Sequence, residues 1–90
     1  MDMTGLPGAD LVEEGLFDLR AGRETMASLL VSIGAPRLQR LGVVLPSVFA
    51  GPEHRLYRLL GLSDPDSAHS QYNALIRRLI SFERALACVR

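Results

Sequence analysis

Residues 66–90 read DSAHSQYNALIRRLISFERALACVR, and their apolar spacing decides the fold class. Six apolar residues recur at alternating intervals of three and four: Tyr72, Leu75, Leu79, Phe82, Leu86 and Val89. This heptad spacing is typical of one face of an α-helix. A second row, Ile76, Ile80 and Ala87, runs beside the first and widens the apolar face. The pattern predicts one unbroken helix from about Pro65 to Cys88, with Asp64 as its N-cap.

The remainder of the chain also has a helical pattern, and no stretch alternates with the period of two that a half-buried strand requires. Shorter helices are predicted to begin at Asp10, Arg23 and Pro52, and to end near Gly22, Ile33 and Gly61. Pro36 cannot donate to a helix ladder, so we expect a break there rather than a kink within one long helix. We therefore predict an all-α fold, a small bundle of four to five helices with a long C-terminal helix.

Residues 42–52 (GVVLPSVFAGP) form the least helical part of this bundle. Their Pro, Gly and β-branched residues predict an extended apolar segment, either lying across the bundle or serving as a docking arm for a partner. We expect Val44, Leu45, Val48 and Phe49 to be buried. The predicted organisation is a flexible N-terminus over 1–9 and a single helical domain over 10–90. Its predicted core comprises Leu16, Leu19, Leu29, Leu30, Ile33, Leu56, Leu60, Leu75, Leu79 and Phe82.

Length and composition narrow the class of protein further. Ninety residues with 48% hydrophobic side chains suit one soluble domain. The single cysteine, Cys88, rules out an internal disulfide, which fits a reducing cytoplasm. We expect no secretory signal in the acidic N-terminus, and no membrane span, because the longest uncharged stretches have 12 residues. Lysine is absent, which excludes a P-loop or Schiff-base lysine.

Charge is divided unevenly along the chain, although the net charge is zero. Residues 1–24 carry six acids and two arginines, a balance of −4, and residues 25–90 carry the opposite balance. The two parts can attract each other within one molecule or between two molecules. They can equally be the solvated faces of ordinary helices.

Candidate reactive residues gather at the start of the last helix. His69, Tyr72 and Asn73 lie three and four residues apart and can share one helix face. No nucleophile elbow and no carboxylate spaced to orient His69 accompany them. His54, His69 and Cys88 do not have the spacing of metal ligands. We therefore expect the polar cluster to be the solvated start of a helix, and we predict no enzyme and no cofactor. A small enzyme using His69 is the second alternative.

A nucleic-acid-binding helical regulator is the first alternative. Its candidate contacts are surface arginines: Arg37, Arg40, Arg77, Arg78 and Arg84. A helix-turn-helix is conceivable over residues 24–42, where two helices would flank a tight turn at Pro36. A protein with no basic excess lacks the strongest sequence feature of this class.

The favoured function is a non-enzymatic protein-protein interaction or regulatory module. A 24-residue helix is about 36 Å long, more than four short neighbours are expected to cover. The uncovered apolar face is predicted to meet a second copy or another protein, most simply in a C₂ homodimer. The predicted partner interface is Tyr72, Leu75, Ile76, Leu79, Ile80, Phe82, Leu86 and Val89.

Overall fold

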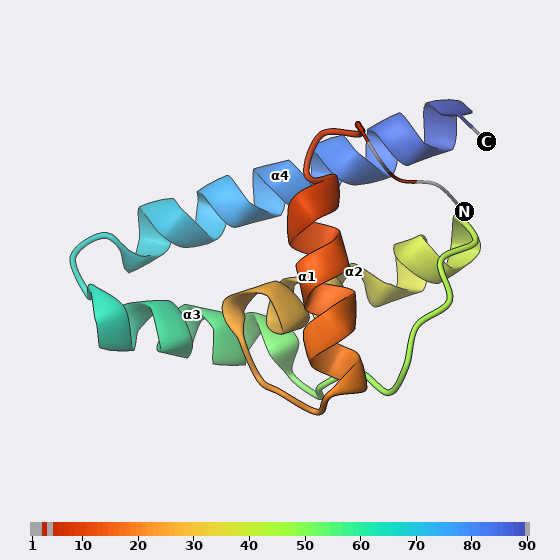
Figure 1. Ribbon diagram of the computed structural model, residues 1–90. Coiled ribbons are helices and arrows are strands. Elements are labelled where there is room, and N and C mark those ends of the chain that lie inside the picture. Colours follow the sequence, from red (N-terminus) through yellow and green to blue (C-terminus); the bar gives the residue numbers. More distant parts are fainter. Residues whose placement is uncertain (1–2, 4, 90) are drawn as a thin grey trace.

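A computed structural model describes residues 3 and 5–89 of the chain. These residues form four α-helices and no strand: α1 (Ala9–Arg20), α2 (Met26–Arg40), α3 (Pro52–Ser63) and α4 (Ala68–Val89) (Figure 1). The predicted all-α class, the number of helices and the long C-terminal helix are confirmed in outline.

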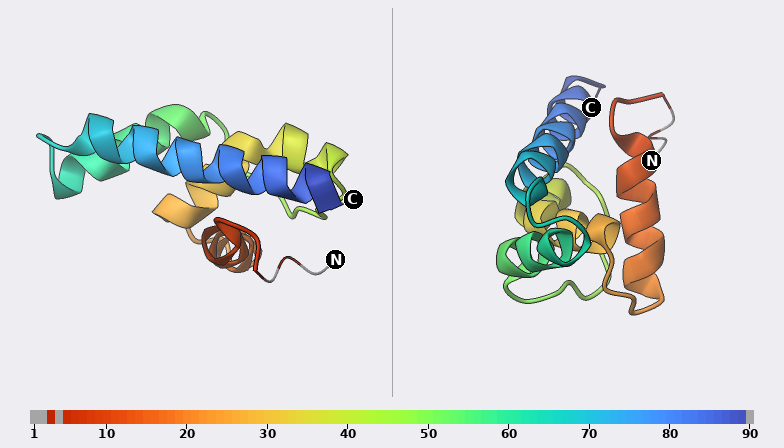
Figure 2. Two further views of the ribbon diagram at one scale, coloured as in Figure 1. Left: turned by 90° about the horizontal axis from the view of Figure 1, so that it is seen from above. Right: turned by 90° about the vertical axis from the view of Figure 1, so that its left-hand side faces the viewer.

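The central element of the fold is α2, which packs against each of the other three helices. α4 runs along the length of the molecule, with α3 beside its first part and α2 beside its last part (Figures 1 and 2). α1 crosses the other helices on one side. Nine residues of α2 are buried: Ala27, Ser28, Leu29, Leu30, Val31, Ser32, Gly34, Ala35 and Leu38.

The core agrees closely with the one predicted from periodicity. The buried members of that prediction are Leu16, Leu19, Leu29, Leu30, Leu56, Leu60, Leu79 and Phe82. Ile33 and Leu75 are only partly buried, because each lies at the edge of a helix-helix contact. Both residues therefore leave part of their apolar surface accessible.

A hydrogen-bond network around the buried Asp18 sets the corner between α1 and α2. Asp18 is 7% exposed, pairs with Arg23 at 3.0 Å and accepts a 2.7 Å hydrogen bond from the Thr25 hydroxyl. These two hydrogen bonds lower the pKa of the Asp18 carboxyl. Thr25 also caps α2 in a capping box with Ser28, so the helix begins at Met26 rather than at Arg23.

The predicted break at Pro36 is wrong, because α2 continues through this residue to Arg40. A proline inside a helix costs one backbone hydrogen bond. Ala35 and Leu38 beside it are 5% and 0% exposed, and the burial of such apolar side chains holds the helix together. The helix-turn-helix considered over residues 24–42 is therefore absent, since one continuous helix occupies most of that stretch.

The apolar segment between α2 and α3 is non-helical, as predicted, but the expected burial is wrong in part. Val44 and Val48 are 86% and 42% exposed, whereas Leu45 and Phe49 are partly buried. Val43 is buried instead. The segment is tied to α2 where the Phe49 amide donates to the Ser32 hydroxyl at 3.2 Å.

Two predicted helix boundaries shift by a few residues. α3 continues past Gly61 to Ser63, and α4 begins at Ala68 rather than at Pro65. Asp64 caps the C-terminus of α3, and its carboxylate accepts a hydrogen bond from the Asp66 amide. The aspartate therefore stabilises the turn between the helices instead of the first turn of α4.

Candidate partner-binding groove

The apolar stripe of α4 is divided between the core and the surface. Leu79, Phe82 and Leu86 are at most 4% exposed, so they pack almost entirely inside their own chain. Tyr72, Leu75, Ile76 and Ile80 are partly buried, and Val89 is 64% exposed. Because α3 and α2 both lie along α4, its length is no longer an argument for a partner. Only the edges of its apolar face remain accessible.

One of these edges opens into a hollow of about 300 Å³ between α2 and α4. Its lining combines apolar side chains of both helices with three charged residues: Ile33, Gly34, Pro36, Arg37 and Arg40 from α2, and Ile76, Leu79, Ile80 and Glu83 from α4. We call this hollow the α2–α4 groove. Its partly exposed apolar walls have the composition typical of the centre of a protein-protein interface.

The groove exists at a place where the two helices approach closely. A Cβ atom at Gly34 would lie 3.0 Å from a methyl of Leu79 and 3.1 Å from Oε2 of Glu83. The absence of a side chain at this position lets α4 settle against α2 there. Pro36 adds a rigid ring to the same wall.

Glu83 is the unusual residue of the groove, and it was not among the predicted site residues. It is 5% exposed, yet among the described residues its carboxylate has no hydrogen-bond donor within bonding distance. Every fully enclosed side-chain nitrogen or oxygen among the described residues has a hydrogen-bond partner. Because the Glu83 oxygens have none, both must keep some contact with solvent. Burial raises the pKa of Glu83, and the positive charges of Arg37 and Arg40 oppose this rise.

The arginines named as candidate nucleic-acid contacts do not form one surface. Arg37 and Arg40 line the groove. Arg77 and Arg84 are exposed and lie about two turns apart on α4, each near Ile80 in the helical repeat. Arg78 lies on another flank, where it pairs with Asp10 of α1 at 3.3 Å. The positive charge that α2 and α4 share is therefore concentrated around the groove.

The predicted polar cluster lies at the far end of α4, against α3. The Tyr57 ring is 6.3 Å from His69 and 5.8 Å from Tyr72, centroid to centroid. His69 interacts with Asn73 at 3.2 Å, and its side chain is exposed at the helix start. Partial burial raises the pKa of Tyr72, and the charge of Glu53 adds to this rise. These contacts hold α3 against α4 and bring no hydroxyl of Ser67 or Ser70 to His69.

The described residues contain no cluster of three or more His, Cys, Asp or Glu able to hold a metal ion. Over the same residues, no helix has the length and hydropathy needed to cross a bilayer. No family model, characterised protein or solved structure matches the chain. The function is therefore inferred from the groove.

Proposed function

We propose that the protein is a non-enzymatic protein-protein interaction module that associates with a second copy of itself through the α2–α4 groove. The observation that carries this proposal is the combination of half-covered isoleucines with the mostly buried Glu83 carboxylate, which has no hydrogen-bond donor among the described residues. A mostly buried carboxylate loses part of its hydration, and a donor or a positive edge from a docked chain would offset that cost. A docked chain would cover both features at once.

The shape of the groove favours a helix over a small molecule. It lies between two packed helices and is bordered by Ile33 on one side and by Ile76 and Ile80 on the other. Amphipathic helices bind in such grooves by inserting apolar anchors, while charged side chains pair around the rim. Arg37 and Arg40 make the rim positive, and the exposed Arg37 favours an acidic partner. The lone exposed thiol of Cys88 fits the reducing cytoplasm proposed for the protein.

Sedimentation of the wild type and of the Ile76→Glu/Ile80→Glu double variant tests this proposal. A charge inside the apolar groove is expected to weaken self-association at least about tenfold, because the buried glutamate would lose its hydration. Leu62→Glu is the matched control, since Leu62 is 78% exposed on α3 and lies outside the groove. The control should associate like the wild type. A wild type that stays monomeric at high micromolar concentration refutes the proposal.

Nucleic-acid binding is the second candidate, supported by the exposed arginines around the groove. If Arg37, Arg77 and Arg84 neutralise phosphates, affinity for a duplex should fall steeply with rising salt. Fluorescence anisotropy with labelled duplex DNA and RNA measures this directly. Absence of binding at about 50 mM salt excludes this candidate.

A further inference from the structure

We propose that the α2–α4 groove of one molecule receives helix α1 of a second copy, with Phe17 as the anchor and Glu13 and Glu14 at the arginine rim. This inference rests on the proposed function and names the element that occupies the groove. The molecules then associate head to tail, each contributing its α1 to one neighbour and its groove to another.

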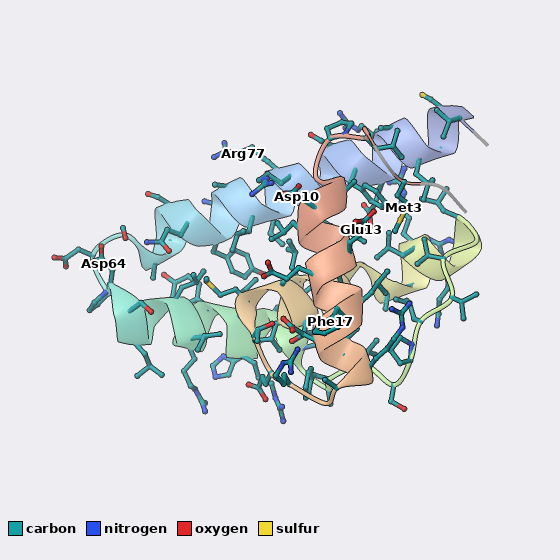
Figure 3. All side chains as sticks on the ribbon, viewed as in Figure 1. Met3, Asp10, Glu13, Phe17, Asp64 and Arg77 are labelled. Atoms are coloured by element: carbon teal, nitrogen blue, oxygen red, sulfur yellow. The ribbon has the colours of Figure 1, made fainter. Side chains whose placement is uncertain are left out.

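The outer face of α1 has the composition that the groove selects. Glu13, Glu14 and Phe17 are all exposed, and their spacing of three and four residues places them on one face. Glu13 and Phe17 are labelled on α1 in Figure 3. Phe17 is 62% exposed, which makes it the most exposed aromatic residue among those described. Glu13 and Glu14 form no ion pair with any described residue of their own chain. An exposed aromatic ring with two carboxylates one turn earlier gives α1 an acidic, amphipathic outer face.

The ring of Phe17 is held in place before any partner arrives. The Arg23 guanidinium lies 5.1 Å from the ring centroid, and Arg23 is itself fixed by its 3.0 Å pair with the buried Asp18. Asp18 is in turn anchored by the Thr25 hydroxyl. An anchor that is already ordered loses little conformational entropy on binding, so more of its contact energy contributes to affinity.

The dimensions and chemistry of the groove match this anchor. An apolar cavity of about 150 Å³ holds a benzene-sized group, so a hollow of about 300 Å³ has room for a phenyl ring. The edge of a phenyl ring carries partial positive charge and can face the Glu83 carboxylate, which lacks a donor. The guanidinium of Arg37, exposed at the rim of the groove, is placed to meet an acid of a docked helix.

The arrangement of the helices makes this contact heterologous. The start of α1 packs on one flank of α4, where a Cβ at Gly8 would touch the Arg78 backbone and the Phe82 side chain. Ile76, Ile80 and Glu83 of the groove lie on another flank of α4. α1 and the groove are therefore separate surfaces, and such pairs assemble into rings or open chains rather than stopping at a two-fold dimer.

Complementation between two variants tests the inference. Phe17→Asp disables α1 and leaves the groove intact, whereas Ile80→Glu disables the groove and leaves α1 intact. Each variant alone should self-associate at least about tenfold more weakly than the wild type. An equimolar mixture should form a complex of two chains, because one intact α1 and one intact groove remain available. Sedimentation velocity separates these species, and circular dichroism verifies that both variants are helical.

The outcomes distinguish this inference from the proposed function. If Phe17→Asp associates like the wild type while Ile80→Glu does not, the groove functions but α1 is not its occupant. If the mixture stays monomeric while the wild type associates, the head-to-tail contact is refuted and a symmetric interface remains. Val44→Asp provides the surface control, because Val44 is 86% exposed and belongs to neither surface. It should associate like the wild type.

Discussion

Gly15 shows how one missing side chain permits the crossing of two helices. A Cβ atom at this position would overlap the carbonyl oxygen of Ala27 and a methyl of Val31, both on α2. Gly61 lies in the interior of α3 and would meet nothing within 4 Å. We predict that Gly15→Ala lowers the free energy of unfolding by about 1–3 kcal/mol through overpacking. Gly61→Ala should raise it by about 0.5–1 kcal/mol, because alanine favours a helix. Urea unfolding measures both, and similar effects at the two sites would contradict the close crossing.

Glu83 makes stability depend on pH in a direction that follows from its burial. Burial raises the pKa of this carboxyl above its ordinary value of 4.5, against the opposing charges of Arg37 and Arg40. The folded chain therefore binds this proton more tightly than the unfolded chain does. The resulting contribution to stability is complete below about pH 4.5 and is lost as the pH rises through the pKa of the folded state.

The Glu83→Gln variant tests this linkage, because glutamine cannot ionise and can donate a hydrogen bond. We predict that this variant is more stable than the wild type at pH 7, and that the difference shrinks below about pH 4.5. Urea unfolding over a pH series measures the difference. A variant less stable than the wild type at pH 7 would show that Glu83 is a favourable ion-pair partner of the arginines instead.

At the scale of the element, α2 contains a proline that its helical geometry does not favour. Pro36 lies inside the helix and lacks the amide that would bond to the Ser32 carbonyl. We predict that Pro36→Ala raises the free energy of unfolding by about 2 kcal/mol, since the gain of about 3 is reduced by a more flexible unfolded chain. Pro46→Ala, in the non-helical segment, is the control and should lower stability by about 0.4–1 kcal/mol. A destabilised Pro36→Ala would mean that the ring is needed for packing.

The sequence predicted the helices well where apolar periodicity and burial coincide, as in α4 and in the leucine core. Pro36 was misread because local geometry argues for a break, while the burial of Ala35 and Leu38 depends on helices distant in sequence. The groove was also beyond a sequence reading, because it combines α2 with α4 across some forty residues of chain. Glu83 had one visible sign: it lies four residues after Leu79 and three before Leu86, both members of the heptad stripe. That sign alone does not distinguish a solvated residue from a buried one.

At the scale of the whole molecule, the opposite net charges of residues 1–24 and 25–90 lie on different surfaces of the structure. Some are satisfied internally, as in the pairs of Asp10 with Arg78 and of Glu24 with Arg55. Glu13 and Glu14 face outward on α1, while Arg37 lies at the groove on another flank. A molecule with complementary surfaces on different sides is suited to repeated association. Its average mass should continue to rise with concentration beyond that of a dimer.

Salt separates the electrostatic part of this association from the apolar part. Ion pairs of Glu13 and Glu14 at the arginine rim should contribute about 0.2–1 kcal/mol each at low salt. Screening shortens from about 10 Å at 0.1 M to about 3 Å at 1 M ionic strength, so the contribution fades over this range. We predict that affinity falls by about two- to thirtyfold between these conditions without vanishing, because Phe17 remains as an apolar anchor.

The Glu13→Gln/Glu14→Gln variant completes this argument, because it removes the charges and keeps the shape of α1. Its affinity at 0.1 M salt should already be about two- to thirtyfold lower than that of the wild type, and should change little on going to 1 M. Sedimentation equilibrium at the two salt concentrations provides the comparison with the wild type. If the variant retains the salt dependence of the wild type, the relevant charges lie elsewhere, and α1 does not approach the arginines of the groove.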